Sequence, residues 1–528
     1  MSRSLRVDPN TRAGLSQLRQ VAAQAVTIEL VEPDTSGEVA LETALGRGEE
    51  VYGHSTGYGA LASHSAADPS TQQEQLIAHL ATGTGPVLDA RSARAVVFER
   101  LVTLSRGHSA ASPPLMKRLA AVLSGPYAPS IPSYGSVGAS GDLTPLAHLA
   151  LNLQDPTQFL RGASALGQLK APRWSPLAFS RRDALALVNG TSASNAVAIL
   201  AWWDLAEIFP LALQSMARMV EAIPAPVQAY AAELHELRGQ PGQNLVAELL
   251  RSFVEPESFP PPVTPGRHHE THLQAAYSFR CIPQILGPSV EALRTAALSL
   301  ERELNGVTDN PVFVDPDGVY HGGNFHGQIV AQVCDSLSLA AANLANLMDR
   351  QIARITDPLL NHGLPPFLTG ARAGAQSGFM GAQVTATALS TEIRASAQRR
   401  YLLESRSTNG ANQDVVSMST PAALALYQTL PRLRELLAIH LMVAVQAHEQ
   451  RFHRAPANAV SQTAFTLSSW VREMSPPLRE DRPLSQDIER ISAALAEATV
   501  HGNAPWLQPT TGRALWMRLF PEAPRELP

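Results

Sequence analysis

The chain has 528 residues, of which 45% are hydrophobic and 16% charged, and its formal net charge at pH 7 is −5. This composition supports a large apolar core under a sparsely charged surface, which favours buried subunit interfaces. The chain has no long basic run, so nucleic acid and anionic membranes are not expected partners. Cys281 and Cys334 are the two cysteines, and lone cysteines in apolar stretches predict reduced thiols and a cytoplasmic location.

Glycine and proline interrupt the first part of the chain often, which predicts a mixed, loop-rich N-terminal domain over residues 1–190. Residues 26–30 are expected to form a strand, and residues 125–145 have the composition of a loop. The apolar run at 184–203 contains six polar or glycine residues in its middle, which would be costly in lipid. We therefore expect no transmembrane segment.

Helical periodicity dominates the rest of the chain, which predicts a mainly α fold with a long central bundle over residues 191–450. Residues 451–528 are more charged and richer in proline, and are expected to form a smaller helical closing layer. A hairpin is expected at 312–321, where turn residues separate two short apolar runs. The predicted helices of the bundle cover residues 193–222 (interrupted by Pro210), 289–304, 328–355, 376–397 and 421–450.

Residues 135–148 form a glycine-rich loop around Ala139-Ser140-Gly141. A plain structural interpretation is that Ser140 or Asp142 caps the helix that follows. The glycine spacing differs from that of a nucleophile elbow or a nucleotide-binding loop, and no lysine follows. A chemical interpretation also fits, because glycine permits a tight bend. The amide nitrogen of Gly141 can then attack the Ala139 carbonyl carbon, and loss of water and of the Ser140 hydroxyl leaves a 4-methylidene-imidazol-5-one ring.

This loop resembles that of the aromatic amino acid ammonia-lyases and aminomutases, which carry such a self-made cofactor. Six further stretches resemble the family's motifs in family order, and residues 350–354, 363–367 and 377–389 resemble the bacterial tyrosine lyases in particular. A single Ala-Ser-Gly is weak evidence, whereas the ordered set is specific. The six stretches are Tyr52-Gly53-His54-Ser55-Thr56-Gly57-Tyr58-Gly59, Asn189-Gly190-Thr191-Ser192, Tyr277-Ser278-Phe279-Arg280-Cys281, Thr308-Asp309-Asn310-Pro311, Gly323-Asn324-Phe325-His326-Gly327 and Asn412-Gln413-Asp414-Val415.

The resemblance implies an enzyme that uses the ring from Ala139, Ser140 and Gly141 as an electrophile for the substrate amine, without a metal or a nucleotide. It implies that Tyr52 is the base for the β-proton and that Tyr277 acts on the amine side. Arg280 would clamp the substrate carboxylate with its planar fork. The other residues expected to bind the ring or the substrate are Asn189, Asn324, Phe325 and Gln413.

Substrate choice is expected to depend on His79 and Leu80, which resemble the His-Leu pair of tyrosine lyases. Histidine lyases show Ser-His at this place and phenylalanine lyases show Phe-Leu. The chemistry is consistent, because His79 can hydrogen-bond a phenol while Leu80 packs against the ring. Taken alone, a histidine on an apolar helix is more often a core residue. The resemblance therefore implies elimination of ammonia from L-tyrosine to give trans-4-coumarate, in a homotetramer whose active sites are shared between subunits.

Other functions share these motifs. A tyrosine 2,3-aminomutase differs only in whether ammonia adds back before the product leaves, and a phenylalanine or dual-specificity lyase differs only in the aryl pocket. An inactive helical scaffold is the non-enzymatic alternative, although it would have no reason to retain the catalytic motifs. Two departures from the family pattern bear on the aryl group and on loop closure. These are Gln274-Ala275-Ala276, where an acidic residue is usual after the glutamine, and His54 and Tyr58 in the first loop.

A histidine-rich stretch, His268-His269-Glu270-Thr271-His272, places two histidines four residues apart. That spacing can bind a metal, but the order is not the His-Glu-x-x-His of zinc proteases. The proposed chemistry also needs no metal. We expect a solvated polar stretch.

Overall fold

A computed structural model describes residues 4–64, 69–164, 167–180, 182–223, 227–254, 274–314, 318–370, 374–452 and 462–501. These residues are mainly helical, which confirms the predicted fold class. The chain divides into two compact units. Unit 1 consists of Met1–Ala201, Ala297–Asp335 and Arg400–Tyr427, and unit 2 consists of Trp202–Ala296, Ser336–Arg399 and Gln428–Pro528. The division into three domains along the chain, at 1–190, 191–450 and 451–528, stays a prediction.

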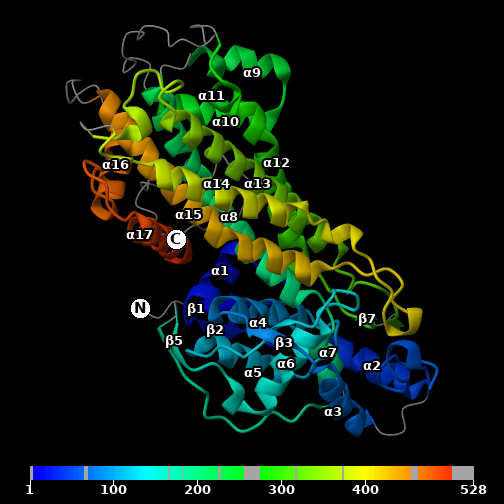
Figure 1. The fold of residues 1–528 in the computed structure, drawn as a ribbon. Coiled ribbons are helices and arrows are strands. Elements are labelled where there is room, and N and C mark those ends of the chain that lie inside the picture. Colours follow the sequence, from blue (N-terminus) through cyan, green and yellow to red (C-terminus); the bar gives the residue numbers. More distant parts are fainter. Residues whose placement is uncertain are drawn as a thin grey trace. The chain divides into compact units, whose positions relative to one another are not determined.

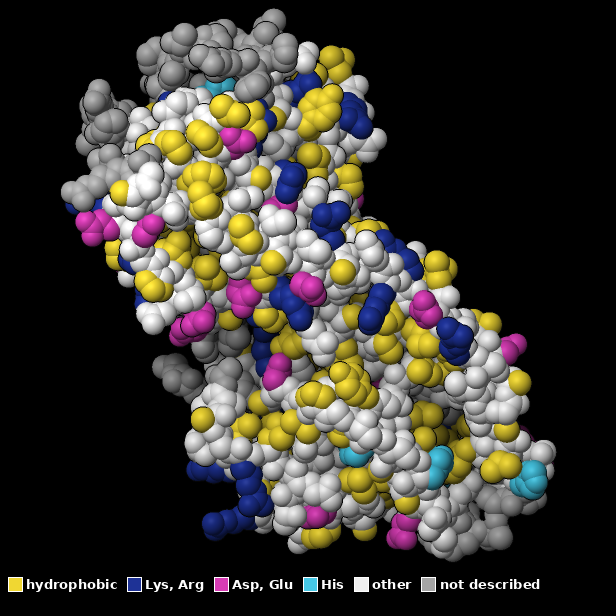
Figure 2. Space-filling model, in the orientation of Figure 1, with side chains coloured by type: hydrophobic (Ala, Val, Ile, Leu, Met, Phe, Trp, Pro, Cys, Tyr) yellow, Lys and Arg dark blue, Asp and Glu magenta, His cyan; other side chains and the backbone are white. Residues whose placement is uncertain are grey.

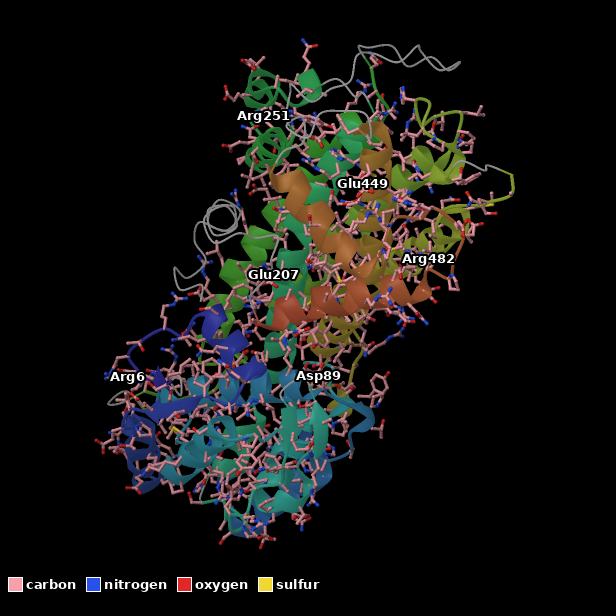
Figure 3. All side chains as sticks on the ribbon, turned by 90° about the vertical axis from the view of Figure 1, so that its left-hand side faces the viewer. Arg6, Asp89, Glu207, Arg251, Glu449 and Arg482 are labelled. Atoms are coloured by element: carbon pink, nitrogen blue, oxygen red, sulfur yellow. The ribbon has the colours of Figure 1, made fainter. Side chains whose placement is uncertain are left out.

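Helix α4 (Ala90–Ser105) is the centre of unit 1, because all of its residues are buried. It packs against α1 (Leu15–Ala23) and α5 (Pro113–Ser124) (Figure 1). Buried Arg94 donates to backbone carbonyls at the ends of both neighbouring helices, which satisfies the guanidinium inside the core. Asp89, labelled in Figure 3, caps α4 by accepting from the Ser92 amide and also accepts from the Tyr427 hydroxyl. Chain segments distant in sequence thus meet in unit 1.

The remaining elements of unit 1 surround this core. Helices α3, α6 and α7 pack against one another and flank the glycine-rich loop. Among the described residues of this unit, the strands form four two-stranded sheets, of which β1–β2 is parallel and the other three are antiparallel. The helices are α2 (Ser36–Gly46), α3 (Pro69–Leu80), α6 (Leu143–Gln154) and α7 (Asp183–Val188), with short 3-10 turns at Gly59–Leu61, Pro156–Gln158, Tyr401–Leu403 and Asn409–Ala411. The strands are β1 (Ser4–Val7), β2 (Thr27–Leu30), β3 (Thr84–Val87), β4 (Pro132–Tyr134), β5 (Gly162–Ser164), β6 (Gly167–Leu169), β7 (Val312–Val314) and β8 (Gly318–Tyr320).

Four long helices contribute residues to both units: α8 (Ser192–Ala222), α12 (Ile282–Leu304), α13 (Gln328–Thr356) and α15 (Ser419–Phe452). In unit 2 they form a bundle with α14 (Met380–Gln398). Hydrogen bonds from side chains connect neighbouring helices of this bundle. Figure 2 shows scattered acidic and basic side chains with apolar ones between them on the visible face. The other elements of unit 2 are α9 (Ala232–Arg238), α10 (Pro241–Phe253), α11 (Tyr277–Arg280), α16 (Gln462–Met474), α17 (Ser485–His501) and short turns at Val227–Tyr230 and Pro366–Leu368.

Most of the predicted elements are present, with two differences. The predicted strand and hairpin correspond to β2 and to the antiparallel pair β7–β8. The prediction that Pro210 interrupts its helix was wrong, because α8 continues through it. Proline removes one backbone hydrogen bond, and dense packing around this fully buried part of the helix compensates for it. Helix α14 begins at Met380, later than predicted, because Gly378 adopts a φ of +57° just before it.

Helix α8 is long and apolar enough to cross a membrane by length and composition alone. Its most apolar stretch is entirely buried within the folded chain, as in the core helix of a globular protein. We therefore assign α8 to the protein core.

Candidate active site

The backbone around Ala139-Ser140-Gly141 is held in a bend that only glycine can adopt. Gly141 has a φ of +73°, and a Cβ atom there would lie 2.3 Å from the Gly190 carbonyl oxygen. The next amide, that of Asp142, donates to the same oxygen at 2.7 Å. The two glycine-containing motifs therefore pack backbone to backbone at Gly141, whereas a Cβ atom at Gly190 would meet Arg100 and Thr308.

Asp142 anchors the loop from its far end. It is fully buried, and its side chain makes no capping hydrogen bond to α6. Its carboxylate instead accepts from the Ser194 amide at 2.6 Å and from the Ser194 hydroxyl at 2.9 Å. The hydroxyls of Ser136 and Thr420 also donate to it. Burial raises the pKa of Asp142, and these hydrogen bonds act in the opposite direction. Asp142 therefore occupies the N-cap position of α6, as the plain interpretation predicts, but its carboxylate binds Ser194 and makes no capping hydrogen bond.

Several helices begin next to this loop. Helix α6 follows it directly, α8 begins at Ser192 beside Asp142, and Gly327, just before α13, donates its amide to the Gly138 carbonyl oxygen at 3.4 Å. Met418, which precedes α15, donates to the Val137 carbonyl oxygen at 2.8 Å. Each helix N-terminus carries partial positive charge. The loop therefore lies in a positive field that favours developing negative charge.

Ser140 and Gln413 are in direct contact. The Gln413 Nε2 donates to the Ser140 hydroxyl at 2.5 Å, while its Oε1 accepts from the Thr408 hydroxyl at 2.6 Å. These two bonds fix the amide orientation of Gln413. Residues 408–413 thereby come to lie against the loop, although they are far from it in sequence.

Asn189 has one polar atom available at the site. Its side chain is buried, and Nδ2 donates to the Asn310 carbonyl oxygen at 3.0 Å. Its Oδ1 has no hydrogen-bond partner among the described residues. A buried acceptor without a partner is costly unless a ligand or modified group pairs with it. Asn189 thus fits the expected role of holding the ring or the substrate.

A buried ion cluster positions Asn310. Asp309 lies 3.5 Å from Arg100 and 4.0 Å from Arg182, and all three side chains are fully buried. Burial raises the pKa of Asp309, while Arg182 and Arg100 lower it. Arg182 also donates to the Asn310 carbonyl oxygen at 3.1 Å. The cluster explains why the Asp309-Asn310 motif accompanies Asn189.

Tyr52 accepts a hydrogen bond at its phenolic oxygen from the Gly59 amide at 2.8 Å. Its own amide donates to His321 Nε2 at 3.2 Å, and its ring lies edge to face with Tyr58, with 6.2 Å between the centroids. The Gly59 amide and the Tyr58 ring therefore fix the orientation of the Tyr52 phenol.

A cavity of about 660 Å³ connects these groups. All of its lining residues belong to unit 1, and the volume suits a small aromatic molecule. Of the residues singled out from the sequence, those that line it are Tyr52, His79, Leu80, Ala139, Ser140, Gly141, Asn189, Phe325 and Gln413.

His79 lies in the last turn of α3 and is exposed to solvent, so it is not a core histidine. Its Nδ1 lies 3.1 Å from the Gln75 carbonyl oxygen. Because a carbonyl can only accept, Nδ1 carries the hydrogen and Nε2 of the neutral ring is an acceptor. The cavity wall therefore offers an acceptor next to the apolar side chain of Leu80.

Sequence reasoning gave no role to several other lining residues. Tyr58 was noticed only as a departure from the family pattern, yet it contacts Tyr52 and its hydroxyl lies 3.4 Å from the Gly53 carbonyl oxygen. Burial raises the pKa of Tyr58, against the influence of Arg182. Asn409 has a φ of +52° and lies against Gly59. Asparagine adopts a positive φ more readily than most residues, and Gly410 follows it with a φ of +62°, so the Asn-Gly pair is a turn signal that the sequence reasoning did not use.

Three predicted residues do not line this cavity. Asn324 is exposed and donates to the Val307 carbonyl oxygen at 3.2 Å. Tyr277 and Arg280 belong to unit 2, where the Arg280 guanidinium lies 4.6 Å from the Tyr277 ring centroid. No cluster of metal-binding side chains occurs among the described residues, and the histidine-rich stretch at 268–272 lies outside them.

Known proteins of one family match this chain over most of its length. The family model for aromatic amino acid lyases matches residues 14–469. The chain is 42% identical to a tyrosine ammonia-lyase of Cereibacter sphaeroides, over 93% of this chain and 97% of that protein. It is 36% identical to a histidine ammonia-lyase of Geobacillus thermodenitrificans, over 90% and 93%. The crystal structure of a tyrosine aminomutase from Streptomyces globisporus matches with a TM-score of 0.83 and 30% identity, over 94% of this chain and 98% of that one.

The chain therefore belongs to the aromatic amino acid lyases, the family of ammonia-lyases and aminomutases. Its reaction class is that of a carbon–nitrogen lyase.

Proposed function

We propose that this protein is a tyrosine ammonia-lyase, which converts L-tyrosine into trans-4-coumarate and ammonia. One observation carries the proposal: Ser140, Tyr52 and the pair His79–Leu80 line the same cavity. Candidates for the electrophile, the base and the recognition of the aromatic ring thus share one space. The 42% identity to a tyrosine ammonia-lyase supports the same substrate.

The preference for a phenol rests on the hydrogen-bonding state of His79. Since its Nδ1 donates to the Gln75 carbonyl oxygen, its Nε2 can accept from the O–H of tyrosine. Phenylalanine would leave this acceptor unpaired, and a site built for a hydroxyl discriminates against the analogue that lacks it. Leu80 supplies apolar contact for the ring. The Asp at position 414 also differs from the Asn-Gln-Glu of histidine lyases.

The residues present fit a 4-methylidene-imidazol-5-one group. The Gly141 bend excludes any side chain, and Asn189 Oδ1 and the Gln413 amide offer hydrogen bonds at the loop. In the cyclisation, the Gly141 nitrogen bonds to the Ala139 carbonyl carbon and that oxygen leaves as water. Ser140 then loses its hydroxyl and its Cα hydrogen as a second water. When formed, the ring supplies an electrophilic carbon for the substrate amine.

Tyr52 is our candidate for the base that removes the β-proton. The Gly59 amide holds the phenolic oxygen in place, and Tyr52 lines the same cavity as Ser140. A proton taken from the substrate would reside on the Tyr52 oxygen.

The site of one chain lacks a cation for the substrate carboxylate among its lining residues. We propose that further copies in a homotetramer supply Tyr277 and Arg280, consistent with the 68% exposure of the Tyr277 side chain. Helix α15 offers little apolar surface for subunit contacts, because other parts of the chain bury its apolar side chains. Exposed apolar side chains instead lie on α13 and α14. They are Ile329, Leu339, Met380 and Val384.

A tyrosine 2,3-aminomutase is the second candidate, which the match to the Streptomyces globisporus structure supports. The two activities differ in whether ammonia adds back to the β-carbon before release. We also propose a cytoplasmic location, supported by the free thiols Cys281 and Cys334.

Incubation with tyrosine, phenylalanine and histidine separately tests the proposal. Mass and ultraviolet spectra of the products should identify 4-coumarate from tyrosine as the main product. A β-amino acid would instead identify an aminomutase, and urocanate from histidine would refute the tyrosine assignment. Absence of any product, together with an unmodified loop, would favour the inactive scaffold.

A further inference from the structure

Helix α11 (Tyr277–Arg280) is a single helical turn that carries two residues of the proposed site. So short a helix leaves backbone carbonyls without partners of its own. Residue 283 would provide the next donor for the Phe279 carbonyl, but it is Pro283, which has no N–H. The Cys281 amide is the local donor to the Tyr277 and Phe279 carbonyl oxygens, and donors from other parts of unit 2 add to it.

Two buried side chains provide these donors. The Gln351 Nε2 donates to the Ser278 carbonyl oxygen at 2.7 Å, and the Tyr230 hydroxyl donates to the Phe279 carbonyl oxygen at 2.7 Å. Both side chains are fully buried. They contact the inner carbonyls of the turn, whereas the Tyr277 side chain points outward and is exposed.

The bond from Gln351 is the end of a longer chain of hydrogen bonds. Gln351 Oε1 lies 2.9 Å from His440 Nε2, and His440 Nδ1 lies 2.7 Å from the Ser215 hydroxyl. The Ser278 carbonyl can only accept, so Nε2 of Gln351 must face it and Oε1 must face His440. His440 Nε2 is then the donor, its Nδ1 is the acceptor, and the Ser215 hydroxyl donates.

Because the His440 imidazole is neutral, each residue from Ser215 to Gln351 donates a hydrogen bond to the next one along the chain of bonds. Ser215, His440 and Gln351 are each fully buried, and burial lowers the pKa of His440 to about 3. The three residues come from α8, α15 and α13, so the chain crosses the bundle of unit 2. Burying these polar groups would be costly if any were unpaired, and here each one has a partner.

We propose that Ser215, His440 and Gln351 form a positioning relay that holds α11 in the conformation in which Tyr277 and Arg280 engage the substrate. The roles of Tyr277 and Arg280 rest on the proposed function. The hydrogen-bond relay does not depend on them. Its consequence is that the orientation of the Gln351 amide, set by His440, decides whether α11 stays folded.

The two cysteines of the chain provide the test. Cys281 is partly exposed and donates its amide to the Tyr277 carbonyl oxygen at 3.0 Å, so its thiol reports opening of α11. Cys334 is fully buried and reports general loosening. In Gln351→Met, we expect Cys281 to react with a thiol reagent about tenfold faster, the effect of losing one buried hydrogen bond. Cys334 should stay protected.

Substitutions at His440 separate positioning from bulk stability. His440→Leu should accelerate Cys281 labelling as Gln351→Met does, whereas His440→Gln can place an amide N–H where Nε2 lies and should restore the slow rate. Leu441 is a fully buried neighbour of His440 on α15 outside the relay, so Leu441→Ala is a control that destabilises the protein without touching the relay. In this variant the thiol of Cys281 should still be labelled at the slow wild-type rate. Wild-type labelling of Cys281 in Gln351→Met, or equal acceleration at Cys334, would overturn the relay.

Kinetics add a measurement that depends on the substrate. If the relay acts through α11, Gln351→Met should lower kcat/KM mainly by raising KM. In the double variant with Arg280→Lys, Gln351→Met should lower kcat/KM little below the value of Arg280→Lys alone. Additive losses in that double-mutant cycle would contradict positioning. The labelling result does not require turnover, so it stands even if the substrate assignment fails.

Discussion

Replacing His79 by phenylalanine should exchange the substrate preference without destroying catalysis. The side chain is exposed to the cavity and makes its one bond within its own helix, so the substitution should change stability by only about 0.5 kcal/mol. It removes the Nε2 acceptor and leaves the tyrosine hydroxyl unpaired in the cavity. The cost of an unpaired hydroxyl is about 2–4 kcal/mol in the transition state, or roughly 30-fold to 1000-fold in kcat/KM.

The gain for phenylalanine should be smaller, because an apolar group in such a pocket contributes about 1–3 kcal/mol. Steady-state kinetics on both amino acids, with ultraviolet detection of coumarate and cinnamate, measure the exchange. Gln75→Ala is the matched control, since it lies on the same helix and keeps the backbone carbonyl that orients His79. This variant should retain the wild-type preference.

The decisive result is the ratio of the two kcat/KM values. If both values fell together in His79→Phe, the residue would have a structural role and the phenol contact would not exist. If tyrosine activity stayed unchanged, the hydroxyl would bind elsewhere in the cavity. Either result would leave the family assignment untouched and remove the main physical argument for tyrosine.

Further expectations concern the loop, the base and the assembly. The measured intact mass should be lower than the mass calculated from the sequence by two waters, and the loss should map to the peptide that contains Ala139–Gly141. Ser140→Ala should abolish both the mass deficit and the activity. An unmodified peptide from folded protein would refute the cofactor. The ring should add a near-ultraviolet absorption band that Trp and Tyr do not explain. Gly141→Ala should prevent ring formation and abolish this band, because its Cβ would meet the Gly190 carbonyl oxygen at 2.3 Å. Gly323→Ala, which has open space around it, should retain the band. Tyr52→Phe should keep that band and lose about 100-fold or more in kcat; unchanged turnover would exclude it as the base. Sedimentation should show a tetramer, and an active monomer at micromolar concentration would contradict the shared site.

Local sequence signals were sufficient for the helical fold and for the bend of the glycine-rich loop, whereas the proposed site residues came from the resemblance to a family. Periodic apolar stripes predicted α12, α13 and α15 because a helix must bury one face, and the hairpin β7–β8 followed from its turn residues. The glycine-rich loop predicted a bend because only glycine tolerates the φ of Gly141. Those features depend on a few neighbouring residues, so a single sequence reveals them.

Other features arise only when distant segments meet. Asp142 looked like a helix cap, but the folded chain surrounds it with Ser194 and Thr420, which lie far along the sequence. The continuity of α8 through Pro210 likewise depends on packing from all sides. The relay from Ser215 to α11 is set by which atoms face each other across the fold. Residue types determine the chemistry that is possible, and only tertiary contacts decide which donors and acceptors meet.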